Sequence, residues 1–230
     1  MENKPDFTVI VPVYNELGRI TDSINTSLST LKSFEIDYEL IIVNDGSTDG
    51  SEKEINLFST IQGVKILNKL NGGIGSAIHV GIKNSTNTYI IFVPVDSPLT
   101  PEVFGAFHNN LGKADILVSY RKVRLGYTLR MKFNSWLYNK VIGLFFGLSL
   151  KDFNWIHLYN RKIFVNGINI EYGGIFMLAE ILIKAKRMNF TFYEFPVEMI
   201  KRSGGVSTAG SFKALSRTGL DFLTFMLRKR

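Results

Sequence analysis

Apolar and polar residues alternate in blocks through the first half of the chain. Short, almost continuous apolar runs predict β-strands buried on both faces at residues 7–13, 38–43, 64–67 and 89–93. Between them, residues 19–34 carry apolar side chains at helical spacing, and a second helix opens in the glycine-containing segment 71–77 and continues to about Lys83. This alternation predicts an α/β fold with a mostly parallel sheet and helices on both faces.

The run at residues 89–93 ends at Pro94 and places one carboxylate, Asp96, just beyond the strand. Thr100 and Pro101 then supply an N-cap and a first helical residue, which predicts that a helix begins there. Ligands of open α/β sheets bind at the carboxyl ends of strands. Asp96 is therefore either a ligand-binding group or a turn former, and this stretch alone favours neither.

The pattern changes after residue 115. We expect a short strand at 116–119, a basic stretch that includes Arg121 and Arg130, an apolar segment at 136–148, a helix at 177–186 and a strand at 190–197. A basic, glycine-containing loop at 201–207 precedes an amphipathic basic helix at 215–230. No linker or repeat interrupts the chain, so we expect one domain over residues 1–230.

The composition narrows the classes of partner. The 230 residues include no cysteine, which excludes disulfides and thiolate metal sites and fits a reducing compartment. The net charge of +7 suggests an anionic partner, and the chain shows no nucleic-acid-binding motif, so we expect no nucleic acid. His79, His108 and His157 are scattered and form no ligand spacing. No secretory signal or confident membrane span is visible.

Three loops follow three of the predicted parallel strands. They carry Tyr14 and Glu16, then Asn44 and Asp45, then Asp96. Because the carboxyl ends of parallel strands share one edge, these side chains should converge on one crevice. An aromatic face can hold a nucleobase and a carboxylate can accept from base or ribose donors, although each loop Asp alone is more often a turn former.

The segments Val-Pro-Val-Tyr-Asn-Glu (11–16), Ile-Val-Asn-Asp-Gly-Ser-Thr-Asp-Gly (42–50) and Asn-Gly-Gly-Ile-Gly-Ser-Ala (71–77) carry a resemblance to a known family. The chain resembles family-2 glycosyltransferases, in particular the dolichyl- or polyprenyl-phosphate mannosyl- and glucosyltransferases. The likeness runs from about residue 7 to residue 207. It implies a GT-A fold: a Rossmann-like nucleotide-sugar-binding half (about 7–118), an acceptor half (about 119–207) and, in this chain, an amphipathic C-terminal helix (about 211–230).

The resemblance also implies roles for individual residues. The base and ribose should meet Pro12, Tyr14, Glu16 and Asp45, with Asn44 beside the base. Asp96 should lie at the diphosphate and at any Mg²⁺ or Mn²⁺. Phosphate groups of donor or acceptor should meet Arg121, Arg130 and Arg202, since the guanidinium fork matches phosphate oxygens. Glu180 is a further candidate, as a catalytic base or as a helix residue paired with a cation.

Several positions depart from the family pattern. The Asp-x-Asp metal motif reads Pro94-Val95-Asp96, so its first carboxylate is missing. Other departures are Asn44, Ile74, Pro98 and Thr208, where relatives often carry Asp, a cation, Gln and Lys. One Asp with a diphosphate would hold Mg²⁺ or Mn²⁺ weakly, since such cations need several oxygen ligands. The missing Asp also supports an alternative, a non-catalytic glycosyltransferase-like subunit.

The resemblance implies an inverting glycosyltransferase that moves a sugar from a UDP- or GDP-linked donor to a polyprenyl phosphate. Such an acceptor is already anionic, whereas a saccharide hydroxyl, the alternative acceptor, needs a base such as Glu180 or Asp152. The apolar segment at 136–146 and the basic C-terminal helix suggest an anionic membrane surface as a partner. We therefore expect a peripheral protein on the cytoplasmic face of the cell membrane. The competing interpretation packs these segments on the core, on a membrane protein or in a homo-oligomer.

Overall fold

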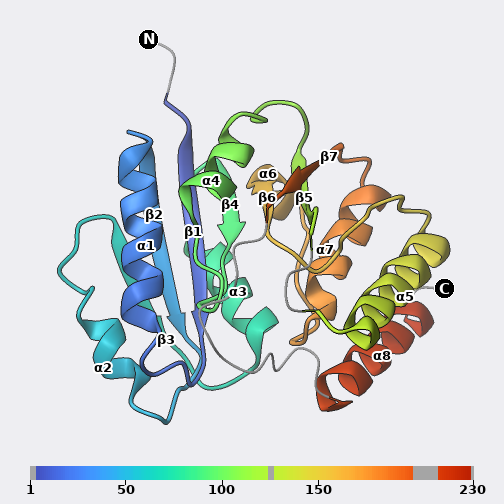
Figure 1. Cartoon of the computed structure of the whole chain (residues 1–230), viewed down its shortest axis with the longest axis horizontal. Coiled ribbons are helices and arrows are strands. Elements are labelled where there is room, and N and C mark those ends of the chain that lie inside the picture. Colours follow the sequence, from blue (N-terminus) through green and yellow to red (C-terminus); the bar gives the residue numbers. More distant parts are fainter. Residues whose placement is uncertain (1–3, 124–126, 199–211, 229–230) are drawn as a thin grey trace.

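A single seven-stranded sheet organises the chain (Figure 1). The computed structural model describes residues 4–123, 127–198 and 212–228. The strands are β1 (Asp6–Val13), β2 (Asp37–Asn44), β3 (Val64–Asn68), β4 (Tyr89–Phe92), β5 (Ile116–Arg121), β6 (His157–Asn160) and β7 (Phe192–Val197). Their order across the sheet is β3-β2-β1-β4-β6-β5-β7. The predicted α/β fold is confirmed.

The sheet is parallel except at one strand. β1 pairs in parallel with β2 and β4, β2 with β3, and β5 with β7, whereas β6 runs antiparallel to both β4 and β5. The sequence did not predict β6, because its four residues follow a mixed aromatic segment without a clear period. β6 runs against its neighbours, so it begins at the sheet edge where β4 and β5 end.

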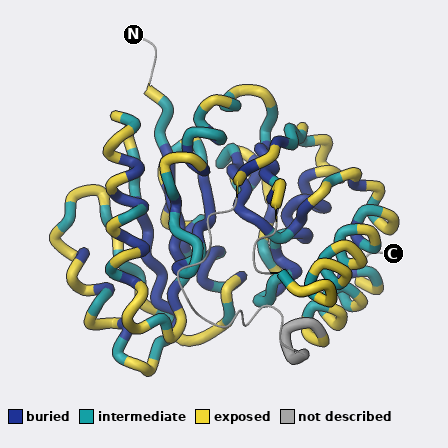
Figure 2. The backbone as a smooth tube through the Cα atoms, viewed as in Figure 1, coloured by how far each residue is buried: buried dark blue, intermediate teal, exposed yellow. Residues whose placement is uncertain are grey.

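Helices cover both faces of the sheet. On one face lie α1 (Ile20–Ser33), α2 (Ser51–Asn56) and α4 (Pro101–His108), packed on one hydrophobic cluster. The other face carries α3 (Ile74–Lys83), α5 (Leu129–Phe146), α6 (Lys162–Val165), α7 (Phe176–Arg187) and α8 (Phe212–Leu227). Figure 2 shows the buried strands between these layers. The apolar runs are continuous because each strand contributes side chains to both clusters.

Neighbouring residues of the same strand face opposite layers of helices. In β1, Ile10 packs in the cluster with α3 and α7, and Val9 packs in the cluster with α1 and α4. In β2, Ile41 and Ile42 divide in the same way, and all four residues are fully buried. The predicted start of α4 is also confirmed: Pro101 is its first residue, and the hydroxyl of Thr100 accepts from the amide of Val103 at 3.5 Å. These local signals place the helix directly after the Asp96 loop.

α5 and α8 lie side by side at one end of the molecule (Figure 1). The rings of Phe145 and Phe222 are 5.6 Å apart, and Phe146 lies at the same distance from Phe225. Within the ranges that the structure describes, no helix combines the length and hydropathy needed to cross a membrane.

Candidate functional site at the carboxyl edge of the sheet

The three loops singled out in the sequence lie at one edge of the sheet. In the parallel register Val13 pairs with Asn44 and Ile10 with Phe92, so the carboxyl ends of β1, β2 and β4 lie at the same edge of the sheet, although β4 ends three residues earlier than β1. The amide of Asp45 donates to the carbonyl of Val13 at 2.8 Å, which joins the first two loops where they leave the sheet. The topology therefore brings Tyr14, Glu16, Asp45 and Asp96 to the same edge.

The loop after β1 is fastened to the loop after β2. Asn15 adopts a left-handed conformation, with φ of 55°, and its side-chain oxygen accepts from the amide of Thr48 at 2.8 Å. In return, the amide of Asn15 donates to the hydroxyl of Ser47 at 3.1 Å. Tyr14, held at the start of this loop, has 49% of its surface exposed. An aromatic face is thus fixed in place yet open to a stacking partner.

Two acidic residues that the sequence did not single out, Asp49 and Glu54, also hold the segment after β1 in place. The carboxylate of Asp49 accepts from the amide of Leu17 at 3.0 Å, and the hydroxyl of Ser51 accepts from the amide of Glu16 at 2.9 Å. Glu54 accepts from the amide of Thr21 at 3.2 Å, in the first turn of α1. Acidic residues near a helix start were a visible signal, but the sequence does not show that they serve the helix of another segment.

Glu16 and Asp96 share a negatively charged environment. The pKa of Glu16 is raised, first by burial, with Asp96 and Asp49 adding to the effect. Arg19 opposes it, with its guanidinium 3.0 Å from the Glu16 carboxylate. Asp96 is half-buried. The site therefore contains carboxylates close enough to influence one another, where cationic groups would bind favourably.

Asn44 and Asp45 are buried, and their side chains form hydrogen bonds and an ion pair within the protein. The Asn44 amide donates to Asn68 at 3.0 Å and its oxygen accepts from the amide of Ser47 at 3.0 Å. The Asp45 carboxylate forms an ion pair with Lys69 at 2.5 Å. It also accepts from the amides of Gly72 at 3.0 Å and Gly73 at 2.8 Å. Asp45 thus anchors the glycine loop before α3. Lys69 was not among the predicted site residues, although the sequence shows a cation directly after the strand β3.

The glycines of that loop allow a close approach to residues 172–174. The amide of Gly75 donates to the carbonyl of Gly173 at 3.2 Å. A Cβ at Gly75 would lie 2.1 Å from the carbonyl oxygen of Tyr172, which no side chain could tolerate without movement. The glycine loop is therefore held between Asp45 on one side and the segment before α7 on the other.

Arg121 lies at the carboxyl end of β5, but its guanidinium faces inward. It forms a two-point ion pair with Asp152, at 2.7 and 3.0 Å, and donates to the hydroxyl of Tyr127 at 2.6 Å. It also lies 4.7 Å from the ring of Trp155. The side chains of Arg121 and Asp152 are 4% and 1% exposed. This arrangement fixes the segment before β6, and it leaves Asp152 buried rather than open to a substrate.

Glu180 is likewise buried in an ion pair. Its carboxylate lies 2.6 Å from the ammonium of Lys184 and accepts from the amides of Glu171 at 3.0 Å and Tyr172 at 3.2 Å. Burial raises its pKa, and the Lys184 contact and the backbone hydrogen bonds oppose that effect. The carboxylate thus supports the segment that contacts the glycine loop, as in the cation-paired interpretation of the sequence.

The remaining predicted site residues are more dispersed. Pro12 is half-buried within β1, and Arg130 is exposed in the first turn of α5. Arg202 and Thr208 lie outside the residues that the structure describes. The structure therefore brings the loops that carry Tyr14, Glu16 and Asp96 to one edge of the sheet, where Asp45 is buried.

A comparison with protein families decides the class of the chain. The model described as glycosyl transferase family 2 matches residues 8–167, well over half of the chain. The chain belongs to glycosyltransferase family 2. The match covers the loops that carry Tyr14, Glu16, Asp45 and Asp96. It confirms the family inferred from the sequence, and the polyprenyl-phosphate branch stays a prediction.

Two uncharacterized glycosyltransferases are similar to this chain over part of its length. An uncharacterized glycosyltransferase of Rickettsia felis is 33% identical over 111 residues, which cover 48% of this chain and 18% of the relative. One from Rickettsia bellii is 36% identical over 98 residues, covering 42% of this chain and 14% of the relative. The match spans less than a fifth of either relative.

Solved glycosyltransferases share the fold over nearly the whole chain. Glucosyl-3-phosphoglycerate synthase from Mycobacterium tuberculosis, in complex with Mn²⁺, UDP and phosphoglyceric acid, gives a TM-score of 0.73 at 12% identity, covering 98% of this chain and 78% of that one. S. aureus TarS 1–349 in complex with UDP-GlcNAc gives 0.57 at 18% identity, covering 95% and 66%. These likenesses confirm the GT-A fold.

The described residues do not form a complete set of ligands for the expected Mg²⁺ or Mn²⁺. Across residues 4–123, 127–198 and 212–228, no group of three or more acidic or histidine side chains is arranged to hold a metal ion. With Pro94 in place of the first carboxylate, Asp96 is the predicted protein ligand. The donor set does not fit a site built by protein groups alone, because Mg²⁺ and Mn²⁺ require several oxygen ligands.

Proposed function

We propose that the chain transfers a sugar from a UDP- or GDP-linked donor to the phosphate oxygen of a polyprenyl phosphate, with inversion at the anomeric carbon. The observation that carries the proposal is the convergence of exposed Tyr14 with Glu16 and Asp96 at one sheet edge, in a chain of glycosyltransferase family 2. The structural neighbours named above were solved with UDP or with UDP-GlcNAc, which supports a nucleotide-sugar donor.

Donor binding follows from the chemistry of these side chains. The exposed ring of Tyr14 offers a face for the base, and Glu16 can accept from ribose hydroxyls. A donor diphosphate beside Asp96 needs positive charge, because carboxylate and phosphate oxygens repel each other. A bound Mg²⁺ or Mn²⁺ would supply such charge, and Arg19, 3.0 Å from Glu16, is a cation that this chain already places nearby.

The burial of the two acids that the sequence suggested as catalytic bases supports a phosphate as the acceptor. Asp152 and Glu180 are both fully buried and lie in ion pairs with Arg121 and Lys184. A phosphate oxygen needs no such base, because it is already ionised at neutral pH. In the proposed step this oxygen forms a bond to the anomeric carbon, and the bond to the nucleoside diphosphate breaks with its electron pair left on the diphosphate.

The exposed faces of α5 and α8 support a position at a membrane. Large apolar side chains on these helices are 44–85% exposed: Leu129, Phe133, Trp136, Leu137, Leu144, Phe145, Leu220, Leu223 and Leu227. Basic residues lie among them, including Arg130 and Arg217. We propose that this face contacts the anionic cytoplasmic surface of the cell membrane, since each cation near such a surface contributes about 1 kcal/mol.

Thermal unfolding with nucleotides tests the donor site. A ligand at 100 times its Kd adds about 2.7 kcal/mol, which for a domain of this size raises Tm by roughly 5–11 °C. We expect such a shift with UDP, GDP or one of their sugars, with Mg²⁺, Mn²⁺ or EDTA showing whether a cation contributes. Tyr14→Ala should reduce the shift, whereas Leu17→Ala, an exposed residue of the same loop, should preserve it.

The same panel separates the alternatives. A nucleotide shift without sugar transfer to any acceptor would favour a non-catalytic subunit. The variant Glu180→Gln addresses the acceptor: we expect lower stability but continued transfer to a polyprenyl phosphate per folded molecule, because the carboxylate supports the segment 171–172. Loss of transfer with stability and nucleotide binding unchanged would instead indicate a catalytic base and a hydroxyl acceptor.

A further inference from the structure

The helix α8 packs on the rest of the protein through an inner face that contains Phe225. The ring of Phe225 lies 5.4 Å from that of Phe176 and 6.0 Å from that of Tyr172, and this side chain is only 2% exposed. From α5, the ring of Phe146 lies 5.6 Å from the same side chain. Leu223, by contrast, is 56% exposed on the outer face of α8. One face of the helix is therefore docked on the segment before α7, and the other face is open.

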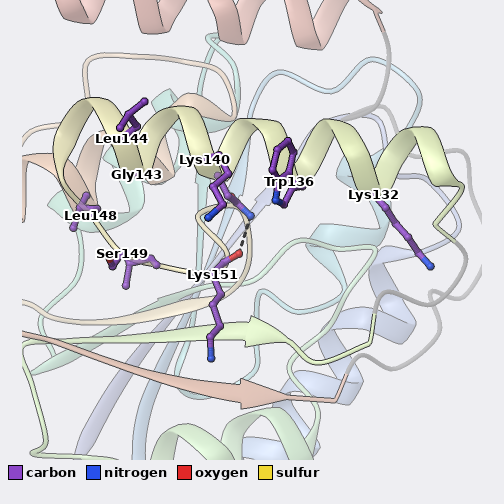
Figure 3. Close-up of a pocket in the computed structure, with 10 residues that line it drawn as sticks. Lys132, Trp136, Lys140, Gly143, Leu144, Leu148, Ser149 and Lys151 are labelled. Atoms are coloured by element: carbon purple, nitrogen blue, oxygen red, sulfur yellow. Dashed lines mark hydrogen bonds between the residues drawn. The ribbon is translucent and has the colours of Figure 1, made fainter.

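The helix α5 gives this contact a fixed support. The side-chain amide of Asn139, in the middle of α5, donates to the carbonyl of Lys151 at 2.7 Å (Figure 3). The oxygen of the same side chain accepts from the amide of Phe153 at 3.3 Å. These bonds join α5 to the segment before β6, so α8 packs against a helix that is itself held in place.

The segment before α7 meets α8 at two consecutive glycines. A Cβ at Gly174 would lie 2.9 Å from the carboxylate of Asp221, and a Cβ at Gly173 would lie 3.2 Å from the guanidinium of Arg217. Arg217, Asp221 and Phe225 are spaced four residues apart, which places them on the same helix face. The two glycines therefore let α8 approach the backbone of this segment closely.

The same segment contacts the glycine loop before α3. The amide of Gly75 donates to the carbonyl of Gly173 at 3.2 Å. A Cβ at Gly173 would lie 2.8 Å from the carbonyl oxygen of Gly72, and a Cβ at Gly73 would lie 2.6 Å from the carbonyl oxygen of Gly173. Gly173 thus contacts both the glycine loop and α8, with no side chain of its own to separate them.

The glycine loop connects these contacts with the proposed donor site. It follows β3, which runs parallel to β2 and ends at the same edge of the sheet. The amides of Gly72 and Gly73 donate to the carboxylate of Asp45 at 3.0 and 2.8 Å. The amide of Asp45 donates in turn to the carbonyl of Val13 at 2.8 Å, next to Tyr14. A continuous series of contacts therefore joins α8 to the loop that carries Tyr14.

Docking of α8 also leaves one polar atom unpaired. The Oδ2 atom of Asp221 is buried and has no hydrogen-bond partner among the described residues. A buried polar atom without a partner opposes the contact that buries it, because it has lost its hydrogen bonds to water. The apolar contacts of Phe225 favour docking and the unpaired oxygen of Asp221 opposes it, which is the balance that a reversible contact requires.

We propose that α8 regulates the donor site, because its docking on Gly173 and Gly174 holds the glycine loop in the arrangement that binds the nucleotide. The two states are α8 docked, with Phe225 buried, and α8 released. Coupling between two sites is reciprocal, so a nucleotide that prefers the docked state also stabilises the docking of α8. Phe225 is then a positioning residue that acts through the segment before α7. The inference rests on the proposed function, since it assigns a regulator to the same donor site.

Amide hydrogen exchange of the wild-type protein tests the reciprocity. The probe is UDP or GDP, whichever raises the Tm of the wild type. We expect saturating nucleotide to slow exchange in residues 216–227 of α8 by on the order of tenfold. Only amides that exchange faster than those of the core strand β1 are compared, because they report local release of α8 rather than global unfolding. Unchanged exchange in α8 while the nucleotide is bound would overturn the proposal.

Matched variants of α8 measure the effect on nucleotide affinity. Phe225→Ala removes the buried ring of the inner face, whereas Leu223→Ala shortens an exposed side chain of the outer face. By calorimetry on the folded proteins, we expect Phe225→Ala to raise the nucleotide Kd on the order of tenfold and Leu223→Ala to keep it within about twofold of wild type. A role in stability alone would lower Tm without changing this Kd, so a wild-type Kd for Phe225→Ala would overturn the proposal. If Phe225→Ala does not fold, the exchange measurement on the wild type decides.

Exchange at the glycine loop distinguishes failure of this inference from failure of the proposed function. If no nucleotide binds the wild type, the proposed donor site fails, and the amides of Gly72 and Gly73 then test the coupling directly. Faster exchange of these amides in Phe225→Ala than in Leu223→Ala would support it, and equal exchange would overturn it. If a nucleotide binds both variants with equal Kd, the donor site stands and regulation by α8 fails.

Discussion

The ion pair between Arg121 and Asp152 allows a quantitative test of whether Arg121 is structural or binds phosphate. The two charges meet at 2.7 and 3.0 Å with side chains 4% and 1% exposed. At an effective dielectric constant of about 20, charges about 3 Å apart attract by roughly 5 kcal/mol. Asp152→Asn removes one charge and leaves the guanidinium buried without its counter-ion. We expect it to lower the free energy of unfolding by about 3–5 kcal/mol.

Urea unfolding followed by circular dichroism measures this effect. With a slope of roughly 3 kcal/mol per molar, the midpoint should fall by about 1–1.7 M. The double variant Arg121→Met with Asp152→Leu should lose less than Asp152→Asn alone, because it buries no unpaired charge. Lys65→Met serves as the control: it removes a cation that is 44% exposed and lies 3.6 Å from Glu39, and it should cost under about 1 kcal/mol.

Two outcomes would refute this reasoning. A midpoint for Asp152→Asn within about 0.3 M of wild type would mean that the buried pair contributes little to stability. A double variant as stable as wild type that has lost the melting shift with UDP or GDP would mean that Arg121 contacts the donor. That result would support the prediction from the sequence that Arg121 contacts a phosphate group.

Two further predictions rest on single contacts. Burial lowers the pKa of His157 to about 4, below its usual 6.5. The folded state thus binds this proton less tightly, so the stability it contributes is present above pH 6.5 and is lost as pH falls towards 4, by roughly 3 kcal/mol. Between pH 7 and pH 4.5 the urea midpoint should fall less in His157→Gln than in wild type, and an equal fall in both would show that His157 is not responsible. Gly75→Ala places a Cβ 2.1 Å from the Tyr172 carbonyl and should cost about 1–3 kcal/mol, with a weaker nucleotide melting shift. Gly219→Ala, with no atom within 4 Å of the added Cβ, should be neutral or stabilising, and equal effects of both substitutions would contradict the steric argument.

Much of the fold was visible in local patterns. The apolar runs predicted β1 to β4, and helical spacing predicted α1 within one residue at either end. Thr100 and Pro101 marked the start of α4. These features depend on contacts between near neighbours in the chain, so a window of the sequence contains the information. The parallel arrangement then placed Tyr14, Glu16, Asp45 and Asp96 at one edge, because strand direction alone decides where each loop emerges.

Partner choice among charged residues was decided only by the tertiary structure. Arg121 and Asp152 are 31 positions apart and Asp45 and Lys69 are 24 apart, and no periodicity predicts such pairs. The short strand β6 was also invisible, since it exists through its pairing with β4 and β5. The sequence by itself determined which residues could be charged, buried or at a strand end. Long-range packing decided whether each carboxylate faces a ligand or an internal cation, because that depends on which segments the fold brings within a few ångströms.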